Sequence, residues 1–358
     1  MTALDINLKE KIIYLIKNKG PINLSKFMEI CLYDKDFGYY SNSKVVGRNG
    51  DFITAPEISQ VFGELISTNI FYNQFKSNFS KVNIVDLGPG KGTLMSDILS
   101  TFKKLNKNNY TISSILFERS DILKKIQKKT LKDNNCLWIN KIDEINELPT
   151  YFIANEFFDA LPINQYISKN GAWHERNINY KNYNLHFEIG KQIRLPLTTN
   201  PNPEGKIIED GIVAKAIIKK ICNKILKNSG ALIIIDYGQL DNYFTEKNTI
   251  QGVLNNKKSS ILENLGYTDL SSWINFTDII NTLPESLKYQ GPITQKQFLL
   301  NLGVKERFEV LSKKKSPLEK RQLISDFERL VSSSFMGQAF KVMIIRSEDL
   351  SSFHGFED

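Results

Sequence analysis

A glycine-rich turn between an apolar strand and a helix is the feature of this sequence that most limits its fold. Residues 86–93 read Asp-Leu-Gly-Pro-Gly-Lys-Gly-Thr. The apolar run at 82–87 predicts a buried strand, and the spacing at 93–105 predicts a helix. Glycine permits a tight turn and lets a ligand approach where a Cβ would otherwise stand. Open α/β sheets bind their ligands at such turns, at the carboxyl ends of their strands.

Strands and amphipathic helices alternate through the rest of the chain. We expect further strands at 112–117, 136–139, 151–154, 163–167, 231–237, 287–290 and 340–345. We expect helices at 5–18, 23–32, 59–75, 121–131 and 210–226. This order predicts an α/β fold with a doubly wound, mainly parallel sheet. The polar and aromatic stretch from 167 to 188 indicates an antiparallel excursion from that sheet.

We expect one catalytic domain with additions. The 358 residues of the chain could form two domains by length alone, but no internal repeat or low-complexity linker divides the chain. We assign residues 1–80 to a helical N-terminal extension that acts as a lid over the site. Residues 81–346 would form the catalytic domain, with inserted segments near 163–208 and 239–286. Residues 347–358 would form a C-terminal tail.

Composition excludes several classes of protein. No run approaches the roughly 18 apolar residues that a membrane span needs. Three widely separated cysteines and three histidines do not form a disulfide framework or a metal-ligand pattern, so we expect no metal. The net charge is +8, but 39 of the 47 basic residues are lysines. Since base readout favours arginine, we do not expect nucleic acid as a partner.

The first residues carry no targeting signal that we can identify. Residues 1–5 begin no apolar signal core, and Asp5 and Glu10 are unlike the acid-poor sequence of a mitochondrial transit peptide. We therefore expect a cytoplasmic protein of a bacterial cell.

The spacing of the glycines distinguishes between ligands. A dinucleotide fingerprint would place a third small residue where this chain has Thr93. Instead, Gly88, Gly90 and Gly92 follow Asp86 in the pattern D-x-G-x-G-x-G. This spacing suits a nucleoside without a pyrophosphate, as in S-adenosylmethionine binding. A dinucleotide site and a turn without a ligand are the alternatives.

Polar residues also follow two neighbouring strands. Glu118 ends the strand at 112–117, where a carboxylate can accept hydrogen bonds from both ribose hydroxyls of a nucleoside. A solvated strand end or a helix cap is the alternative. Asn155, Glu156 and Asp159 follow the strand at 151–154 and are flanked by aromatic residues. Such groups at the mouth of a sheet predict an acceptor pocket, with a packed turn as the alternative.

These stretches and several others make the sequence resemble a known family. The run at 50–64 reads GDFITAPEISQVFGE, and the segment 155–162 reads NEFFDALP. The motifs IDYG at 235–238, GPITQ at 291–295 and MGQAFK at 336–341 follow in order. Over residues 8–346 the chain resembles the MidA family of class I methyltransferases, which are Rossmann-like. That family includes a complex I assembly factor that acts as a protein arginine methyltransferase.

The resemblance implies a cofactor, a site and a partner. The cofactor would be S-adenosylmethionine, held by Asp86, the three glycines and Glu118. The segment 54–60 would line the site through Thr54, Pro56, Glu57 and Gln60. The protein substrate would be a subunit of respiratory complex I, the NADH-quinone oxidoreductase. Where the family usually has Arg-Gly and a nearby histidine, this chain has Gln251-Gly252 and Asn255-Asn256-Lys257.

An arginine acceptor would need carboxylates, since these can hold a guanidinium and localise its charge. Glu156 is our first candidate and Asp159 our second, with Asn155 beside them. Asp51 and Glu57 are the alternatives. A methyltransferase for a small molecule or another acceptor, and a non-catalytic assembly chaperone that retains the cofactor pocket, are the other functions that the sequence allows.

Overall fold

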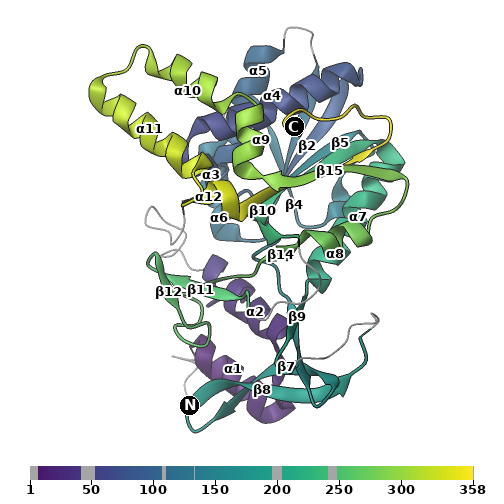
Figure 1. Cartoon of the computed structure of the whole chain (residues 1–358), viewed down its shortest axis with the longest axis vertical. Helices are drawn as coiled ribbons and strands as arrows, with labels where there is room; N and C mark the ends of the chain where they lie inside the picture. Colours follow the sequence, from purple (N-terminus) through teal and green to yellow (C-terminus); the bar gives the residue numbers. More distant parts are fainter. Residues whose placement is uncertain are drawn as a thin grey trace. The chain divides into compact units, whose positions relative to one another are not determined.

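The computed structural model describes residues 7–41, 53–106, 110–132, 134–195, 204–240 and 248–357 (Figure 1). The chain divides into two units. The first is made of Met1–Phe52, Asp159–Ala216 and Leu240–Ile279, and the second of Ile53–Phe158, Ile217–Gln239 and Ile280–Asp358.

A mixed sheet forms the centre of the second unit. Its strands are β2 (Lys81–Leu87), β3 (Thr111–Phe117), β4 (Cys136–Ile139), β5 (Thr150–Asn155), β10 (Gly230–Gln239), β15 (Leu287–Thr294) and β16 (Phe340–Ser347). They lie in the order β15-β16-β10-β5-β2-β3-β4. The five strands from β10 to β4 are parallel, whereas β16 is antiparallel to both of its neighbours. The predicted doubly wound, mainly parallel sheet is confirmed.

The chain order changes direction between β2 and β5. From β2 the chain moves outward through β3 to β4, and it then returns to place β5 on the other side of β2. In open α/β sheets ligands bind at this switch point, outside the carboxyl ends of the two strands. The turn after β2 and the segment after β5 are therefore the first places to look for a site.

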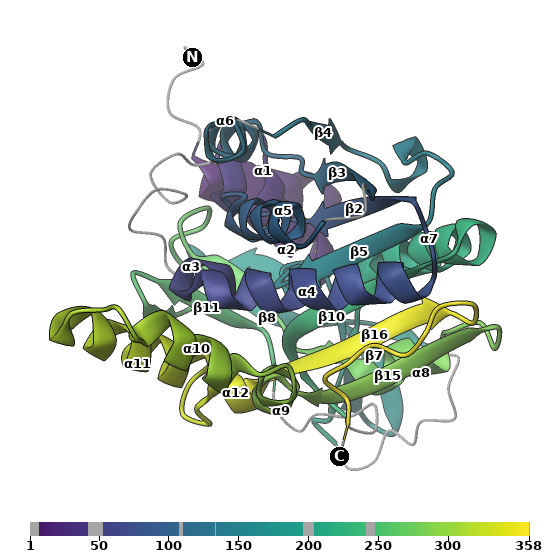
Figure 2. The same cartoon turned by 90° about the horizontal axis from the view of Figure 1, so that it is seen from above.

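Helices cover the sheet and connect its strands. They are α3 (Ala55–Ile58), α4 (Gln60–Lys76), α5 (Thr93–Leu105), α6 (Asp121–Thr130), α7 (Ile212–Asn228), α9 (Gln295–Asn301), α10 (Val304–Ser312), α11 (Pro317–Val331) and α12 (Met336–Ala339), with a short 3₁₀ turn at Ile142–Glu144. Figure 2 shows α4 and α5 lying side by side across one face of the sheet. Ile66 of α4 and Ile98 of α5 pack there against Ile84 and Ile153 in the main core. Residues 53–80, which we assigned to the N-terminal extension, thus belong to the unit that contains the sheet.

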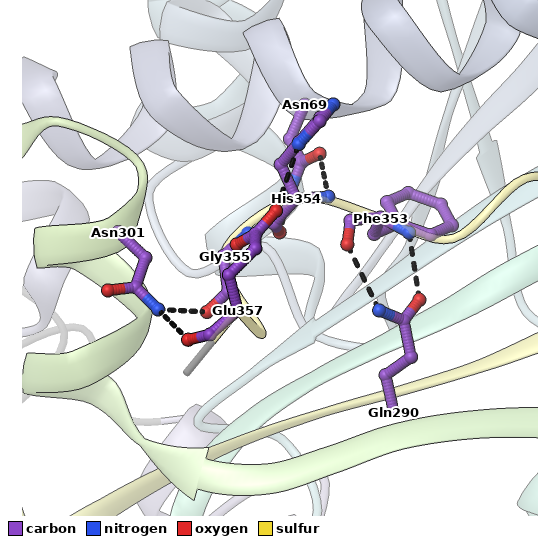
Figure 3. A network of polar contacts seen from close by, with 7 residues as sticks. All are labelled: Asn69, Gln290, Asn301, Phe353, His354, Gly355 and Glu357. Carbon is purple, nitrogen blue, oxygen red and sulfur yellow. Dashed lines mark hydrogen bonds and ion pairs between the residues drawn. The ribbon is translucent and has the colours of Figure 1, made fainter.

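The segment after β16 is built into the same unit (Figure 3). The side-chain amide of Gln290 exchanges two hydrogen bonds with the backbone of Phe353, at 2.8 and 3.0 Å. The Asn69 amide does the same with His354, at 2.9 and 3.2 Å. The Phe353 ring is buried in the core. The residues that we expected to form a tail are thus held by their backbone as well as by apolar burial.

Antiparallel strands and N-terminal helices make up the first unit. Its sheet contains β1 (Ile22–Asn23), β6 (Asn164–Lys169), β7 (Ala172–Lys181), β8 (Asn184–Ile193) and β9 (Ile207–Asp210). A second sheet contains β11 (Gln251–Leu254), β12 (Lys257–Ser259) and β13 (Asp269–Ser271), and the remaining elements are a 3₁₀ turn at Tyr39–Ser41, β14 (Ile274–Asn275) and α8 (Phe276–Asn281). Helices α1 (Leu8–Lys19) and α2 (Leu24–Tyr33) share a core with Ile178 and Leu185. The antiparallel excursion that the sequence indicated is present.

Candidate active site

The glycine-rich turn after β2 has the backbone conformation that its sequence predicts. Gly88, Gly90 and Gly92 have φ angles of 65°, 54° and 85°, in the left-handed region that favours glycine. A Cβ on Gly88 would lie 2.8 Å from Cδ2 of Phe157. A Cβ on Gly90 would meet no atom within 4 Å. The turn is thus packed against protein at Gly88 and open at Gly90, where a ligand could lie against the backbone.

Asp86, at the end of β2, is buried and incompletely hydrogen bonded. Its side chain is 1% exposed, and among the described residues its Oδ2 has no hydrogen-bond partner. Burial raises the pKa of Asp86 to about 7, and the charge of nearby Glu118 contributes to the shift. A buried acceptor without a partner is costly unless a ligand or a proton satisfies it. Asp86 therefore fits a ligand that brings a donor to this turn.

Glu118 follows β3 and is held from two sides. Its Oε1 accepts from the backbone N–H of Ser120 at 2.7 Å, and its Oε2 accepts from Nε2 of Gln127 at 3.0 Å. Burial is the main cause that raises the pKa of Glu118, and these donors oppose the rise. Each carboxylate oxygen can accept more than one hydrogen bond. Glu118 therefore has acceptor capacity for hydroxyl groups, although it also helps to fix the start of α6.

The sequence interpretation missed Gln127. This side chain is fully buried on α6 and lies between the glycine turn and Glu118. A signal was present, because Leu123, Gln127 and Leu131 follow one another at four-residue intervals and all three are buried. A polar residue in an apolar helical stripe breaks the pattern of the stripe. Such a break marks a side chain with a specific partner.

The segment 54–60 contacts the glycine turn through Glu57. The Glu57 carboxylate forms an ion pair with Nζ of Lys91 at 3.1 Å, and it accepts a short hydrogen bond from the Thr93 hydroxyl. Thr54 precedes α3 as its N-cap, and Pro56 is buried in its first turn. Gln60 is exposed at the start of α4, with Nε2 3.4 Å from Oε1 of Glu64. Of the four residues that we expected to line the site here, Glu57 contacts the turn directly.

Glu156 has an unusual backbone at the end of β5. Its φ angle is 51°, in the left-handed region that non-glycine residues seldom adopt. Its Oε1 accepts long hydrogen bonds from the backbone N–H of Ala55, at 3.4 Å, and from Nδ2 of Asn155, at 3.3 Å. Asn155 itself is buried, and among the described residues its Oδ1 has no partner. Backbone strain of this kind accumulates at functional sites.

Asp236 of β10 fixes the turn that follows Glu156. Its Oδ2 accepts from the backbone N–H groups of Phe157, at 3.2 Å, and Phe158, at 2.9 Å. The ring of Phe157 packs edge to face on Phe117, with centroids 6.1 Å apart. The segment after β5 is thereby attached to β10 and β3, and it also packs on the turn after β2, because Phe157 occupies the space beside Gly88. We had noted Asp236 only as part of a motif and assigned it no role.

Two of the expected carboxylates are not placed with this group. Asp159 begins a segment of the first unit, where it is buried, and burial raises its pKa to about 7. Its backbone carbonyl accepts from the N–H of Ser272 at 2.9 Å. Asp51 lies outside the described residues. The structure thus brings Asp86, the three glycines, Glu118, Glu57, Asn155 and Glu156 together in the second unit.

Neither a membrane-spanning helix nor a group of metal-ligating side chains is found within the described residues. No helix there is long and apolar enough to cross a membrane. No group of three or more histidine, cysteine, aspartate or glutamate side chains is placed to hold a metal ion in that same part of the chain.

Comparisons with solved structures agree with the fold. A protein from Burkholderia thailandensis, crystallised with S-adenosyl-homocysteine, matches with a TM-score of 0.79 at 20% identity. The match covers 97% of this chain and 93% of that one. A second structure, of an uncharacterized protein from the same organism, matches with a TM-score of 0.80 at 21% identity, over 96% of this chain and 92% of that one.

Sequence comparisons identify the family. Residues 67–293 match the family described as "Putative S-adenosyl-L-methionine-dependent methyltransferase". The chain is 32% identical to the mitochondrial protein arginine methyltransferase NDUFAF7 of Xenopus tropicalis, over 92% of this chain and 83% of that protein. It is 31% identical to the protein of the same name in Danio rerio, over 90% and 82%. The chain therefore belongs to the MidA family of S-adenosyl-L-methionine-dependent methyltransferases.

Proposed function

We propose that this methyltransferase transfers a methyl group to an arginine side chain of a protein, and that Glu156 receives the guanidinium. The observation that supports this most is the left-handed backbone of Glu156 at the end of β5. Two long hydrogen bonds hold its carboxylate beside α3 and Asn155. The turn after β2, the neighbouring strand, carries the proposed cofactor site.

The residues present fit the cofactor of this family. Oδ2 of Asp86 is a buried acceptor without a partner among the described residues. Gly90 leaves space against the backbone of the turn. Gly88 and Gly92 would shape that turn, and Glu118 would accept the ribose hydroxyls. When bound, S-adenosyl-L-methionine supplies a methyl group on a sulfonium, which is reactive without covalent help from the protein. The protein then contributes mainly alignment, which accounts for up to about 7–11 kcal/mol of barrier lowering.

An arginine needs more help than most acceptors. Its charge is delocalised and its pKa exceeds about 12, so its nitrogens are poor nucleophiles. A carboxylate that binds one side of the guanidinium localises positive charge there and leaves the opposite nitrogen better able to attack. Glu156 would have this role; the attacking nitrogen gains the methyl group, S-adenosyl-homocysteine leaves as the neutral thioether, and the proton that this nitrogen loses passes to water. Asn155 lies beside Glu156, and its side-chain carbonyl has no partner among the described residues.

The protein substrate and the compartment complete the proposal. The relatives from Danio rerio and Xenopus tropicalis carry arginine methylation in their names, which supports a protein arginine as acceptor. From the family resemblance we propose a subunit of respiratory complex I as the substrate, methylated during assembly. From the sequence we propose that the reaction takes place in the cytoplasm of a bacterial cell.

Glu156→Gln tests the acceptor assignment because it keeps the shape of the side chain and removes its charge. We expect this variant to bind S-adenosyl-homocysteine as the wild type does and to lose methyl transfer to the protein substrate. Glu319→Gln, at an exposed position in the first turn of α11, is the matched control and should retain both properties. Calorimetry measures binding, and transfer of a radiolabelled methyl group measures activity.

The identity of the acceptor needs a separate test. Mass spectrometry of complex I subunits from a deletion strain should show the loss of a methylated arginine. Replacement of that arginine by lysine should abolish the modification, because an ammonium does not present the planar fork of a guanidinium. A methylated small molecule, or wild-type transfer by Glu156→Gln, would remove the arginine assignment and leave the cofactor site unaffected.

A further inference from the structure

We infer that Gln127 is the positioning residue that sets Glu118 and the glycine turn for cofactor binding, an inference that rests on the proposed cofactor site. Gln127 hydrogen bonds to three segments that are separate in the sequence: the glycine turn, the residue that follows β3, and β4. Its Nε2 donates to the Gly90 carbonyl at 2.8 Å and to Oε2 of Glu118 at 3.0 Å. Its Oε1 accepts from Nε1 of Trp138 on β4 at 2.8 Å.

The chemistry of these partners fixes the orientation of the amide. An indole N–H only donates and a backbone carbonyl only accepts, so the Gln127 oxygen must face Trp138 and its nitrogen must face Gly90. A flipped amide would set donor against donor on one side and acceptor against acceptor on the other. The two N–H groups of Gln127 are therefore both directed at the proposed cofactor site, one at the turn and one at Glu118.

Burial makes this arrangement specific to an amide. The Gln127 side chain is fully buried, and its stem packs 3.5 Å from the position that a Cβ on Gly92 would occupy. A buried polar side chain with every hydrogen bond satisfied is rigid, and it has no water with which to exchange partners. Gln127 thus determines where the Gly90 carbonyl and the Glu118 carboxylate lie before a cofactor arrives.

Gln127 also affects the ionisation of Glu118. Burial raises the pKa of Glu118, and the hydrogen bond from Gln127 opposes that rise by stabilising the carboxylate. The ionised carboxylate is the stronger acceptor for two hydroxyls, because both of its oxygens carry negative charge and neither carries a proton. Loss of the Gln127 amide should therefore move the acid limb of cofactor binding to higher pH, which a residue that only fills space would not do.

The test is calorimetric binding of S-adenosyl-homocysteine from pH 5.5 to 8.5 by the full-length protein. Gln127→Met keeps the length of the side chain and removes the amide. We expect its Kd to rise at least tenfold at pH 7.5, with the acid limb shifted to higher pH. In steady-state assays KM for S-adenosyl-L-methionine should rise while kcat stays within about twofold. Lys129→Met, at an exposed position of the same helix, should change none of these values.

Gln127→Glu keeps the test decisive if the methionine variant is poorly folded. At high pH its carboxylate faces the Gly90 carbonyl and Glu118, so binding should be weaker than in the wild type. As the pH falls, one proton shared by the two carboxylates restores a donor, and the ratio of variant to wild-type Kd should shrink. A folded Gln127→Met or Gln127→Glu with the wild-type Kd and pH profile would overturn the role of Gln127.

A different result would overturn the cofactor site itself. If the wild type binds S-adenosyl-homocysteine and Gly90→Val and Glu118→Gln bind it equally well, the proposed site is wrong and the role of Gln127 is wrong with it. If those two variants lose binding and the Gln127 variants do not, the site stands and only the role of Gln127 fails.

Discussion

Replacing Glu156 by glycine should slow catalysis strongly at little cost in stability. The backbone at this position has φ 51°, a conformation that costs a residue with a Cβ about 1–2 kcal/mol and glycine almost nothing. Relief of this strain is opposed by the greater flexibility of glycine in the unfolded chain, about 0.5–1 kcal/mol. Two of the hydrogen bonds that the substitution removes are long, at 3.3 and 3.4 Å, and contribute about 0.5 kcal/mol each. The free energy of unfolding should therefore change by no more than about 1 kcal/mol.

Methyl transfer should respond quite differently to Glu156→Gly. Loss of a charged partner for the guanidinium should cost roughly 3 kcal/mol in the transition state, or about a hundredfold in rate. Urea denaturation measures the free energy of unfolding, and transfer of a radiolabelled methyl group measures the rate. Ala154→Gly, two positions earlier and inside β5, has no positive φ to relieve, so it should lose stability and keep activity. A Glu156→Gly protein that is destabilised by more than about 2 kcal/mol, or that transfers methyl at the wild-type rate, would refute the reasoning.

Three further changes probe the cofactor half of the site. Gly90→Val puts a branched side chain into the open space of the turn and should abolish S-adenosyl-homocysteine binding in calorimetry while circular dichroism shows an intact fold; unfolding or normal binding would contradict our view of the turn. Glu118→Ala should weaken the same binding by roughly 1–3 kcal/mol, and an unchanged affinity would reduce Glu118 to a cap of α6. Asp86 has a folded pKa raised to about 7, so ionisation adds no cost to its burial below pH 4 and adds progressively more as the pH rises to 7. The stability of Asp86→Asn relative to the wild type should therefore increase between pH 4 and 7, by at most about 1.4 kcal/mol per pH unit, and a constant difference in urea denaturation would be evidence against the raised pKa.

Local segments of this fold could be predicted well from the sequence. The helix expected at 93–105 and the strand expected at 136–139 have the same bounds in the structure. Each is determined by apolar spacing together with a nearby turn residue, which are properties of neighbouring residues. We expected strands near 287–290 and 340–345 but not their direction. The antiparallel pairing of β16 with β10 depends on how the chain returns to the sheet, and no local pattern reports that path.

The features of the site that we missed depend on contacts between distant residues. Glu156 has a left-handed backbone although nothing in the run Asn-Glu-Phe-Phe marks it. The next two backbone N–H groups donate to the carboxylate of Asp236, which lies on another strand. The grouping of α1 and α2 with the antiparallel strands likewise depends on a shared core. We had instead drawn a boundary at residue 80 from the change in sequence pattern.

A break in strand periodicity locates the site without any knowledge of the family. Val82 and Ile84 of β2 belong to the main core, and alternation places Asp86 on the same face of the sheet. Tyr151 and Ile153 of β5 continue in the same way to Asn155. Both series thus change from apolar to polar at the carboxyl ends of adjacent strands while burial continues, and each polar side chain has an acceptor oxygen without a partner among the described residues. A fold selected for stability alone would place apolar side chains at both positions, so sites where local rules fail together are expected to be functional. The same reasoning applies to Gln127, the polar residue within the apolar stripe of α6. Asp86, Asn155 and Gln127 thus all lie around the glycine-rich turn after β2.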